Sequence, residues 1–199
     1  MGEDTLGVEP SLSSIMLSRD GMRFALGEPD SPNGGQVRVF SFDYTSQVWD
    51  DSASPLNGNT VEGHLLGSRL SFSGDGKRLA VTARDESDDY DNKVWIVKVF
   101  VELGAEWFQI GDDIFGSGTN DLIGPSLTLS EDGKKLGIGS VEINESTEDE
   151  EGRIRVFVEK LKCWLEVEQI NPETSYTNKD GYISMSKEGT RLTIGIPPS

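Results

Sequence analysis

The sequence has little of the side-chain chemistry on which many enzymes depend. Among its 199 residues there is one cysteine, Cys163, and one histidine, His64. A single cysteine cannot form an intramolecular disulfide. Its place beside Trp164, in a partly apolar segment, favours an inert buried thiol over a nucleophile. Zinc sites and Ser-His-Asp catalysis usually need histidine or cysteine partners, so both are disfavoured. We therefore expect no catalytic residues and no cofactor, and interpret the protein as non-enzymatic.

Long apolar stretches and positive charge are also scarce. No run of about 18 apolar residues is present, so insertion into a membrane is not expected. The first residues have neither the basic start nor the apolar stretch of a secretory signal peptide, and the compartment stays open. Acidic residues outnumber basic ones by 35 to 18, giving a formal net charge of −17. This charge disfavours nucleic acid as a partner, because phosphate contacts need clustered lysine and arginine. A solvated acidic surface, cationic partners or divalent ions remain compatible with it.

A short turn motif recurs four times at nearly constant spacing. It reads Asp-Gly three times and Glu-Gly once, with a serine two residues before the acid in every copy. Its glycines are Gly21, Gly76, Gly133 and Gly189, which are 55, 57 and 56 residues apart. A fixed period of this size marks a repeat protein in which each repeat is one supersecondary unit.

Large apolar and small residues alternate on both sides of each turn, as in 70–73 and 79–82. This period-two pattern predicts two strands joined as a hairpin, whose turn needs the positive φ that glycine supplies. A third strand is predicted at 37–40, 94–97 and 154–157. A fourth is marked by Trp49, Trp107 and Trp164, for which packing within or between repeats is the simplest role. No segment has sustained helical periodicity. We therefore predict an all-β fold of four-stranded antiparallel blades of the β-propeller type.

The predicted architecture is one domain, 1–199, formed by a single repeat array. The repeats cover about 11–66, 67–122 and 123–178, with a partial repeat at 179–199, so there are about three and a half repeats of roughly 56 residues. Closed propellers typically have four to eight blades. A partial or open propeller leaves strand edges unpaired, and such edges promote self-association. The alternative is that the chain is a fragment of a larger surface protein.

The segment between the predicted second and third strands varies most in length, and two of its copies are strongly acidic. Length variation at one place in each repeat puts these loops together on one rim. Their carboxylates could gather around a hard cation, but their spacing matches no known calcium loop, and a solvated loop is the alternative. The candidate metal ligands are Asp85, Asp88, Asp89, Asp91, Glu148, Asp149 and Glu150.

Trp95 is the other candidate on this rim. The predicted third strands align it with Arg38 and Arg155, so it breaks the repeat, and we expect it to be half-exposed. The candidate binding surface consists of Trp95, Asp85, Glu86 and Tyr90. Paired carboxylates also raise the alternative of a glycosidase-like hydrolase with an acidic pocket. That chemistry needs two acids held at a defined separation, for which a long charged loop is poorly suited.

The stretch Ser-Leu-Thr-Leu-Ser-Glu-Asp-Gly-Lys-Lys-Leu-Gly-Ile-Gly at 126–139, followed by 152–157 and Trp164, resembles the propeller repeats of large algal and diatom surface proteins. Their blades resemble those of the integrin α-chain propeller. The stretch 72–81 also resembles strands of TolB-like and WD-related propellers. The resemblance implies a propeller that binds a protein or glycan partner, or a cell surface, outside the cell.

Integrin-type blades hold calcium in an Asp-x-Asp-x-Asp-Gly loop between their first two strands. In this sequence the loop has shrunk to a turn with a single carboxylate, whereas calcium needs six to eight oxygen ligands. The calcium site of that family is therefore not carried over, and the aspartate of the turn is interpreted as structural.

Overall fold

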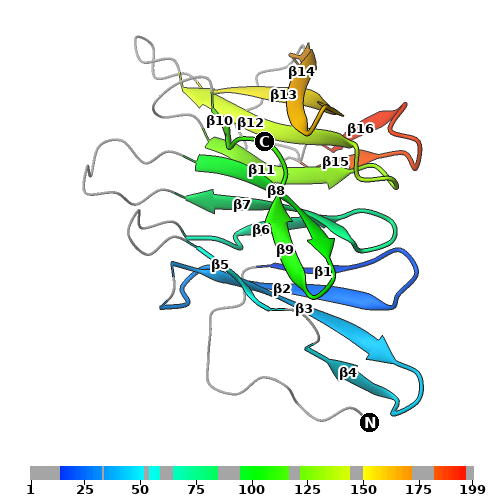
Figure 1. The fold of residues 1–199 in the computed structure, drawn as a ribbon. Helices are drawn as coiled ribbons and strands as arrows, with labels where there is room; N and C mark the ends of the chain where they lie inside the picture. The colour runs from blue at the N-terminus through cyan, green and yellow to red at the C-terminus, as the bar shows by residue number, and fades with distance from the viewer. Residues whose placement is uncertain are drawn as a thin grey trace.

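The computed structural model of the protein describes residues 14–32, 34–51, 54–58, 65–84, 95–116, 122–143, 150–171 and 182–195, with the backbone alone at 142, 143, 150 and 151. Within these ranges the chain forms sixteen strands in four antiparallel sheets. Figure 1 shows the sheets following one another in chain order, from the first in blue to the fourth in red. No helix in these ranges is long and apolar enough to span a membrane.

Each sheet takes its strands from one stretch of the sequence. The first sheet contains β1 (Ser14–Leu17), β2 (Arg23–Glu28), β3 (Gln36–Asp43), β4 (Val48–Asp50) and β5 (Leu56–Asn57). The second contains β6 (Arg69–Phe72), β7 (Arg78–Arg84), β8 (Trp95–Leu103), β9 (Glu106–Gln109) and β10 (Ile114–Phe115). The third contains β11 (Leu122–Leu129), β12 (Lys135–Ile143), β13 (Glu150–Lys160) and β14 (Cys163–Ile170). The fourth contains β15 (Tyr182–Met185) and β16 (Leu192–Gly195).

The predicted all-β fold and its antiparallel hairpins are confirmed. In every sheet the first two strands pair across the Asp-Gly or Glu-Gly turn, and in the first three sheets the next two strands follow in order. The first two sheets also gain a short fifth strand, because β5 pairs with β3 and β10 pairs with β8. The sequence pattern did not predict these two-residue strands.

Each Ser-x-Asp-Gly turn is closed by its own side chains. In the second sheet Ser73 Oγ donates to Asp75 Oδ1 at 2.7 Å, and that oxygen also accepts from the amide of Lys77 at 3.0 Å. The amide of Arg78 donates to Ser73 Oγ at 2.9 Å. Gly76 has a φ of 64°, which other residues rarely adopt. The first and third turns repeat these bonds, so the interpretation of the aspartate as structural is confirmed.

The same hydrogen bonds predict a pH dependence. Burial alone would raise the pKa of Asp132, but the bonds from the Ser130 hydroxyl and the Lys134 amide hold that pKa below its usual value. A depressed folded-state pKa contributes stability that is present above the unfolded pKa of about 4 and is lost as the pH falls through the folded value. Asp132→Asn should therefore flatten the loss of unfolding free energy below about pH 4, as measured by urea titrations between pH 7 and pH 3. Asp50→Asn, which removes an exposed carboxylate outside the turns, is the control. Equal slopes for both variants would contradict the prediction.

The strand registers show which third-strand residues are equivalent in the first three sheets. In each of these sheets, the residue five positions after the turn glycine lies on the second strand, and its cross-strand neighbour on the third strand is basic. The pairs are Leu26 with Arg38, Val81 with Lys98 and Ile138 with Arg155. Lys98, and not Trp95, is therefore the counterpart of Arg38 and Arg155, and the predicted alignment was wrong by three residues in the second repeat.

The cause of this error is that β8 is buried on both faces. Ile96 belongs to the apolar cluster between the first and second sheets, whereas Val97 belongs to the cluster between the second and third sheets. A strand covered on both sides reads as a nearly continuous apolar run, so alternation cannot fix its register. The core of the protein thus consists of two apolar layers, each lying between two neighbouring sheets.

Candidate functional site

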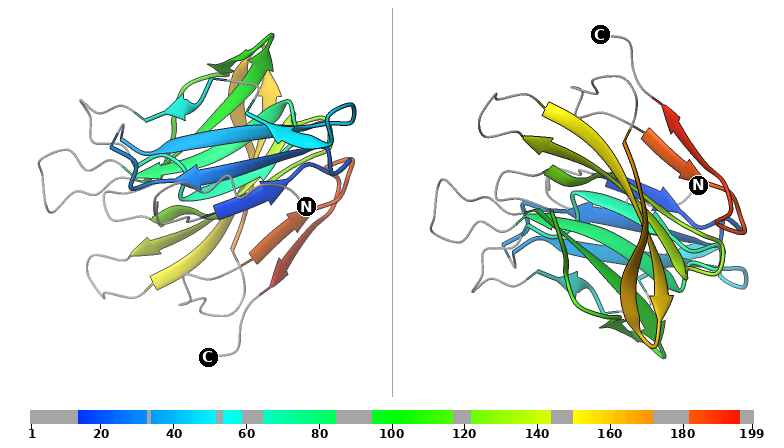
Figure 2. Two further views of the ribbon diagram at one scale, coloured as in Figure 1. Left: turned by 90° about the horizontal axis from the view of Figure 1, so that it is seen from below. Right: turned by 90° about the horizontal axis from the view of Figure 1, so that it is seen from above.

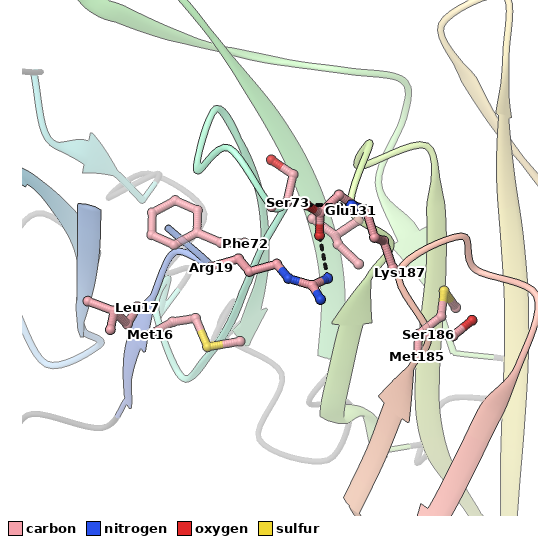
Figure 3. Close-up of a pocket in the computed structure, with 11 residues that line it drawn as sticks. Met16, Leu17, Arg19, Phe72, Ser73, Glu131, Met185, Ser186 and Lys187 are labelled. Carbon is pink, nitrogen blue, oxygen red and sulfur yellow. Dashed lines mark hydrogen bonds and ion pairs between the residues drawn. The ribbon is translucent and has the colours of Figure 1, made fainter. Parts of the chain in front are cut away.

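The first strands of the four sheets line a common hollow. β1, β6, β11 and β15 contact one another in that order, and their ends enclose a pocket of about 190 Å³ (Figure 3). Its apolar lining comes from Met16, Leu17, Phe72, Leu129 and Met185. The turns that follow these strands lie at the same end of the sheets, on the right in Figure 1, and supply the polar rim of the pocket.

The rim is formed by one repeated sequence position. Arg19, Gly74, Glu131 and Lys187 each lie two residues before the turn glycine of their sheet. Arg19 Nη1 donates to Glu131 Oε2 at 2.7 Å, and Lys187 Nζ lies 3.8 Å from Glu131 Oε1 (Figure 3). Two exposed cations therefore share the one carboxylate among the side chains that line this pocket, in a chain of net charge −17.

Gly74 makes the shared carboxylate possible. A Cβ atom at this position would lie 2.3 Å from the carboxylate carbon of Glu131, so a side chain here would displace that carboxylate from its place beside Arg19. The backbones of the turns are also linked. The amide of Gly74 donates to the carbonyl of Glu131, and the amide of Glu131 donates to the carbonyl of Lys187, both at 2.9 Å. The rim is thus held in place by main-chain bonds between three sheets.

One of the acidic candidates from the sequence, Glu150, lies within the described residues. Asp85, Glu86, Asp88, Asp89, Tyr90, Asp91, Glu148 and Asp149 lie outside the described residues. Glu150 is described by its backbone, which opens β13 opposite Ile143. Over the described ranges, no three histidine, cysteine, aspartate or glutamate side chains gather as a metal site would require. Metal binding by the acidic loops therefore stays a prediction.

Trp95 lies at the far end of its sheet from the pocket. It is the first residue of β8 and pairs with Arg84, the last residue of β7, whose guanidinium carbon is 5.7 Å from the tryptophan ring centroid. The indole is half-buried and packs against the apolar cluster between the second and third sheets. Its partial exposure agrees with the expectation from sequence, and its role in binding stays a prediction.

The fourth-strand tryptophans pack as expected, but the neighbouring cysteine does not. Trp107 packs on the first apolar cluster and Trp164 on the second, and Trp164 Nε1 donates to the carbonyl of Ile110 at 3.1 Å. Cys163, predicted to be buried, is exposed at the start of β14. The reason is that the side chains of adjacent strand residues point to opposite faces, so burial of Trp164 turns its neighbour toward solvent.

The pocket between the first strands of the four sheets, called the axial pocket from here on, was not predicted from the sequence, although a signal for it was present. Within the four turns the serine and the glycine never change, and the acid stays acidic. The residue between the serine and the acid is arginine, glycine, glutamate and lysine in turn. The structural residues of the turn are thus kept in every repeat, while this one position changes between opposite charges. Such a change indicates that the side chain at this position contacts groups outside its own turn.

Comparisons with known proteins identify the architecture. No protein-family model matches the sequence, and no curated protein matches it. Among solved structures, the Dos1 propeller has a TM-score of 0.50 at 16% identity, over 92% of this chain and 42% of that one. The α-L-arabinanase of Penicillium chrysogenum, complexed with arabinobiose, has a TM-score of 0.50 at 12% identity, over 88% of this chain and 56% of that one. The chain thus spans about half the length of these structures. Its four sheets are blades of a partial β-propeller.

Proposed function

We propose that this chain is a non-enzymatic β-propeller scaffold that recognises a protein partner through its axial pocket. The observation that supports this function is the pairing of Arg19 and Lys187 with the single carboxylate of Glu131 above an apolar floor. Such a pocket offers two exposed cations that can exchange Glu131 for an acidic group of a ligand. Apolar lining with a few convergent polar groups is the usual composition of a binding pocket.

The best-fitting ligand is a peptide segment with an acidic side chain next to an aliphatic one. The acidic group would pair with Arg19 or Lys187 at the rim, and the aliphatic side chain would lie against Met16 and Met185, whose flexible thioethers adapt to varied shapes. A glycan could also enter a pocket of this size. The apolar floor and the absence of aromatic rings other than Phe72 among the lining residues favour a peptide.

The alternative of a glycosidase-like hydrolase has less support at this pocket. Glycoside hydrolysis uses two carboxyl groups about 5 to 10 Å apart, one of them acting as the acid. Among the residues that line the pocket, Glu131 is the one carboxylate, and it is already paired with Arg19. Release of reducing sugar from arabinan or another polysaccharide by the purified chain would contradict the non-enzymatic proposal.

Selection from a random peptide display library tests the binding site. Peptides that bind the wild-type chain should be enriched in aspartate and glutamate, and Arg19→Ala/Lys187→Ala should weaken them about tenfold or more, because hydrogen bonds to charged groups contribute about 1.5 to 3 kcal/mol. Lys77→Ala/Lys160→Ala removes two exposed cations that do not line the pocket and is the matched control. Equal losses in the two double variants would indicate non-specific attraction of acidic peptides, and unchanged affinity in both would place the site elsewhere.

A further inference from the structure

Every junction between successive blades is held by the same contact. A basic side chain two residues after the turn glycine of the earlier blade donates to the carbonyl oxygen of the turn glycine in the later blade. The bonds run from Arg23 to Gly76 at 2.7 Å, from Arg78 to Gly133 at 3.3 Å and from Lys135 to Gly189 at 3.1 Å. At the first two junctions the same cation also pairs with a glutamate of the later blade, Glu102 or Glu159.

At the first junction the later blade also adds an aromatic surface. Trp107 lies beside the cation of the first blade, with Arg23 Cζ 5.8 Å from its ring centroid. Phe100, on the third strand of the same blade, is buried in the apolar layer between the two blades. The second blade therefore accepts the first with a glycine carbonyl, a tryptophan and a phenylalanine.

The first blade carries this accepting set on the face opposite to Val39, which belongs to the apolar layer between the first two blades; on this face Phe40 is itself buried, at 2% exposure. Phe40 and Trp49 occupy the positions of Phe100 and Trp107, and Phe24 stacks on Phe40 at 4.6 Å and meets Trp49 edge-on at 4.7 Å. On the same face the side chains of β1 are open to solvent, with Ile15 71% exposed and Leu17 56% exposed. The carbonyl of Gly21 accepts no hydrogen bond from any described residue.

The fourth blade carries the complementary donor. Arg191 lies two residues after Gly189, which is the position of Arg23, Arg78 and Lys135 in the other blades. It is exposed, and its guanidinium forms no hydrogen bond or ion pair with the residues that the structure describes. The first and fourth blades lie at the two ends of the described array (Figures 1 and 2). They thus present the acceptor and the donor of the cation-to-carbonyl bond that the chain itself forms three times.

We propose that two copies of this chain associate head to tail, with the fourth blade of one copy packed on the first blade of the next. Arg191 of one copy would donate to the carbonyl of Gly21 and lie over Trp49 of the other, as Arg23 does with Gly76 and Trp107. The contact is heterologous, because different surfaces of the two copies meet. It covers the exposed Ile15 and Leu17 with the kind of surface that covers their counterparts inside the chain.

One position departs from the internal junctions and supplies a decisive variant. The amides of Glu102 and Glu159 donate to Lys77 and Lys134, and in the first blade the amide of Phe42 makes the same bond to Met22. Phe42 therefore stands where the other blades place the glutamate that neutralises the incoming cation. If Arg191 docks as Arg23 does, Phe42→Glu should tighten the association about tenfold or more, since it supplies the missing ion pair in a desolvated contact. If the first blade instead associates only through its apolar surface, the same substitution should weaken the association of the two copies.

Sedimentation velocity over a range of concentrations measures these effects. The wild-type chain should associate, Arg191→Ala should weaken the association about tenfold or more, and Phe42→Glu should strengthen it. Each variant is first compared with the wild type by circular dichroism and thermal unfolding, so that misfolding is recognised. A wild-type chain that stays monomeric at all concentrations would overturn the proposal, as would a weaker association of Phe42→Glu.

Mixing two one-sided variants tests the direction of the contact. Arg191→Glu removes the donor end, and Ile15→Lys blocks the accepting face, so each variant alone should be monomeric. A mixture retains one intact donor and one intact acceptor and should form 1:1 dimers and no larger species. Symmetric pairing through the first blades would instead leave Arg191→Glu associated on its own, and symmetric pairing through the fourth blades would do the same for Ile15→Lys. Either result would overturn head-to-tail assembly.

Discussion

Replacing Arg23 with alanine is expected to lower the free energy of unfolding by about 3 to 5 kcal/mol. The side chain is 10% exposed and its partner Glu102 is 13% exposed. Their two hydrogen bonds, at 2.8 and 2.6 Å, join the first two blades, and the guanidinium also donates to the carbonyl of Gly76 and to Ser41 Oγ. Without Arg23, the carboxylate of Glu102 stays largely buried without its cation, which costs more than the lost contact itself.

Arg19→Ala is the matched control for this prediction. Arg19 also forms an ion pair with a glutamate, at 2.7 Å, but its side chain is 59% exposed. Pairs in contact with water are worth about 0 to 1 kcal/mol, so this variant should unfold at nearly the wild-type urea concentration. The comparison contrasts a buried ion pair with an exposed one, and Arg23→Ala additionally removes the bonds to Gly76 and Ser41. Equal losses would show that junction stability does not depend on the desolvated pair.

A double variant separates the charge from the packing. Arg23→Leu/Glu102→Leu removes both charges and keeps apolar volume at the junction. It should be more stable than Arg23→Ala, because a buried pair replaced by apolar side chains leaves no uncompensated charge. Urea unfolding of the wild type, Arg23→Leu, Glu102→Leu and the double variant gives the coupling energy directly. A double variant as unstable as the sum of its single substitutions would contradict the assignment of the loss to Glu102.

Gly27→Ala should lower the free energy of unfolding by about 3 kcal/mol. Gly27 lies in β2, and a Cβ atom there would be 2.0 Å from the carbonyl oxygen of Gly67 and 2.9 Å from its carbon. These are backbone atoms, so the whole peptide entering the second blade must move. That carbonyl already accepts a hydrogen bond from Ser14 Oγ at 3.0 Å, which such a movement would break.

Gly195→Ala tests the same position of the repeat without the collision. Gly195 lies six residues after its turn glycine, as Gly27 does, and pairs with the first residue of β15. A Cβ atom there would be 3.7 Å from the nearest atom, an ordinary contact. The variant should be as stable as the wild type or gain about 0.5 kcal/mol, because glycine within a strand is less favourable than alanine. A comparable loss in both variants, measured by thermal or urea unfolding, would show that the position is sensitive for a reason other than the approach of Gly67.

The features that depend on contacts within a single repeat could be predicted from the sequence. The serine, aspartate and glycine of each turn form bonds within six residues, so their pattern predicts the hairpin without knowledge of the rest of the fold. The third strand of the second repeat was placed wrongly because neighbouring blades bury both faces of β8. The pocket could not be predicted either, since Arg19 and Glu131 are 112 residues apart and meet only when the blades are arranged around an axis.

The junction contacts have a consequence for how such an array grows. Each blade donates with a side chain and accepts with the main-chain carbonyl of its turn glycine. An acceptor made of backbone is copied whenever the turn is copied, whatever happens to the side chains around it. A duplicated repeat therefore has both the donating side chain and the accepting carbonyl that pair with the repeat from which it was copied. The array can lengthen by gene duplication without a compensating substitution in either neighbouring blade.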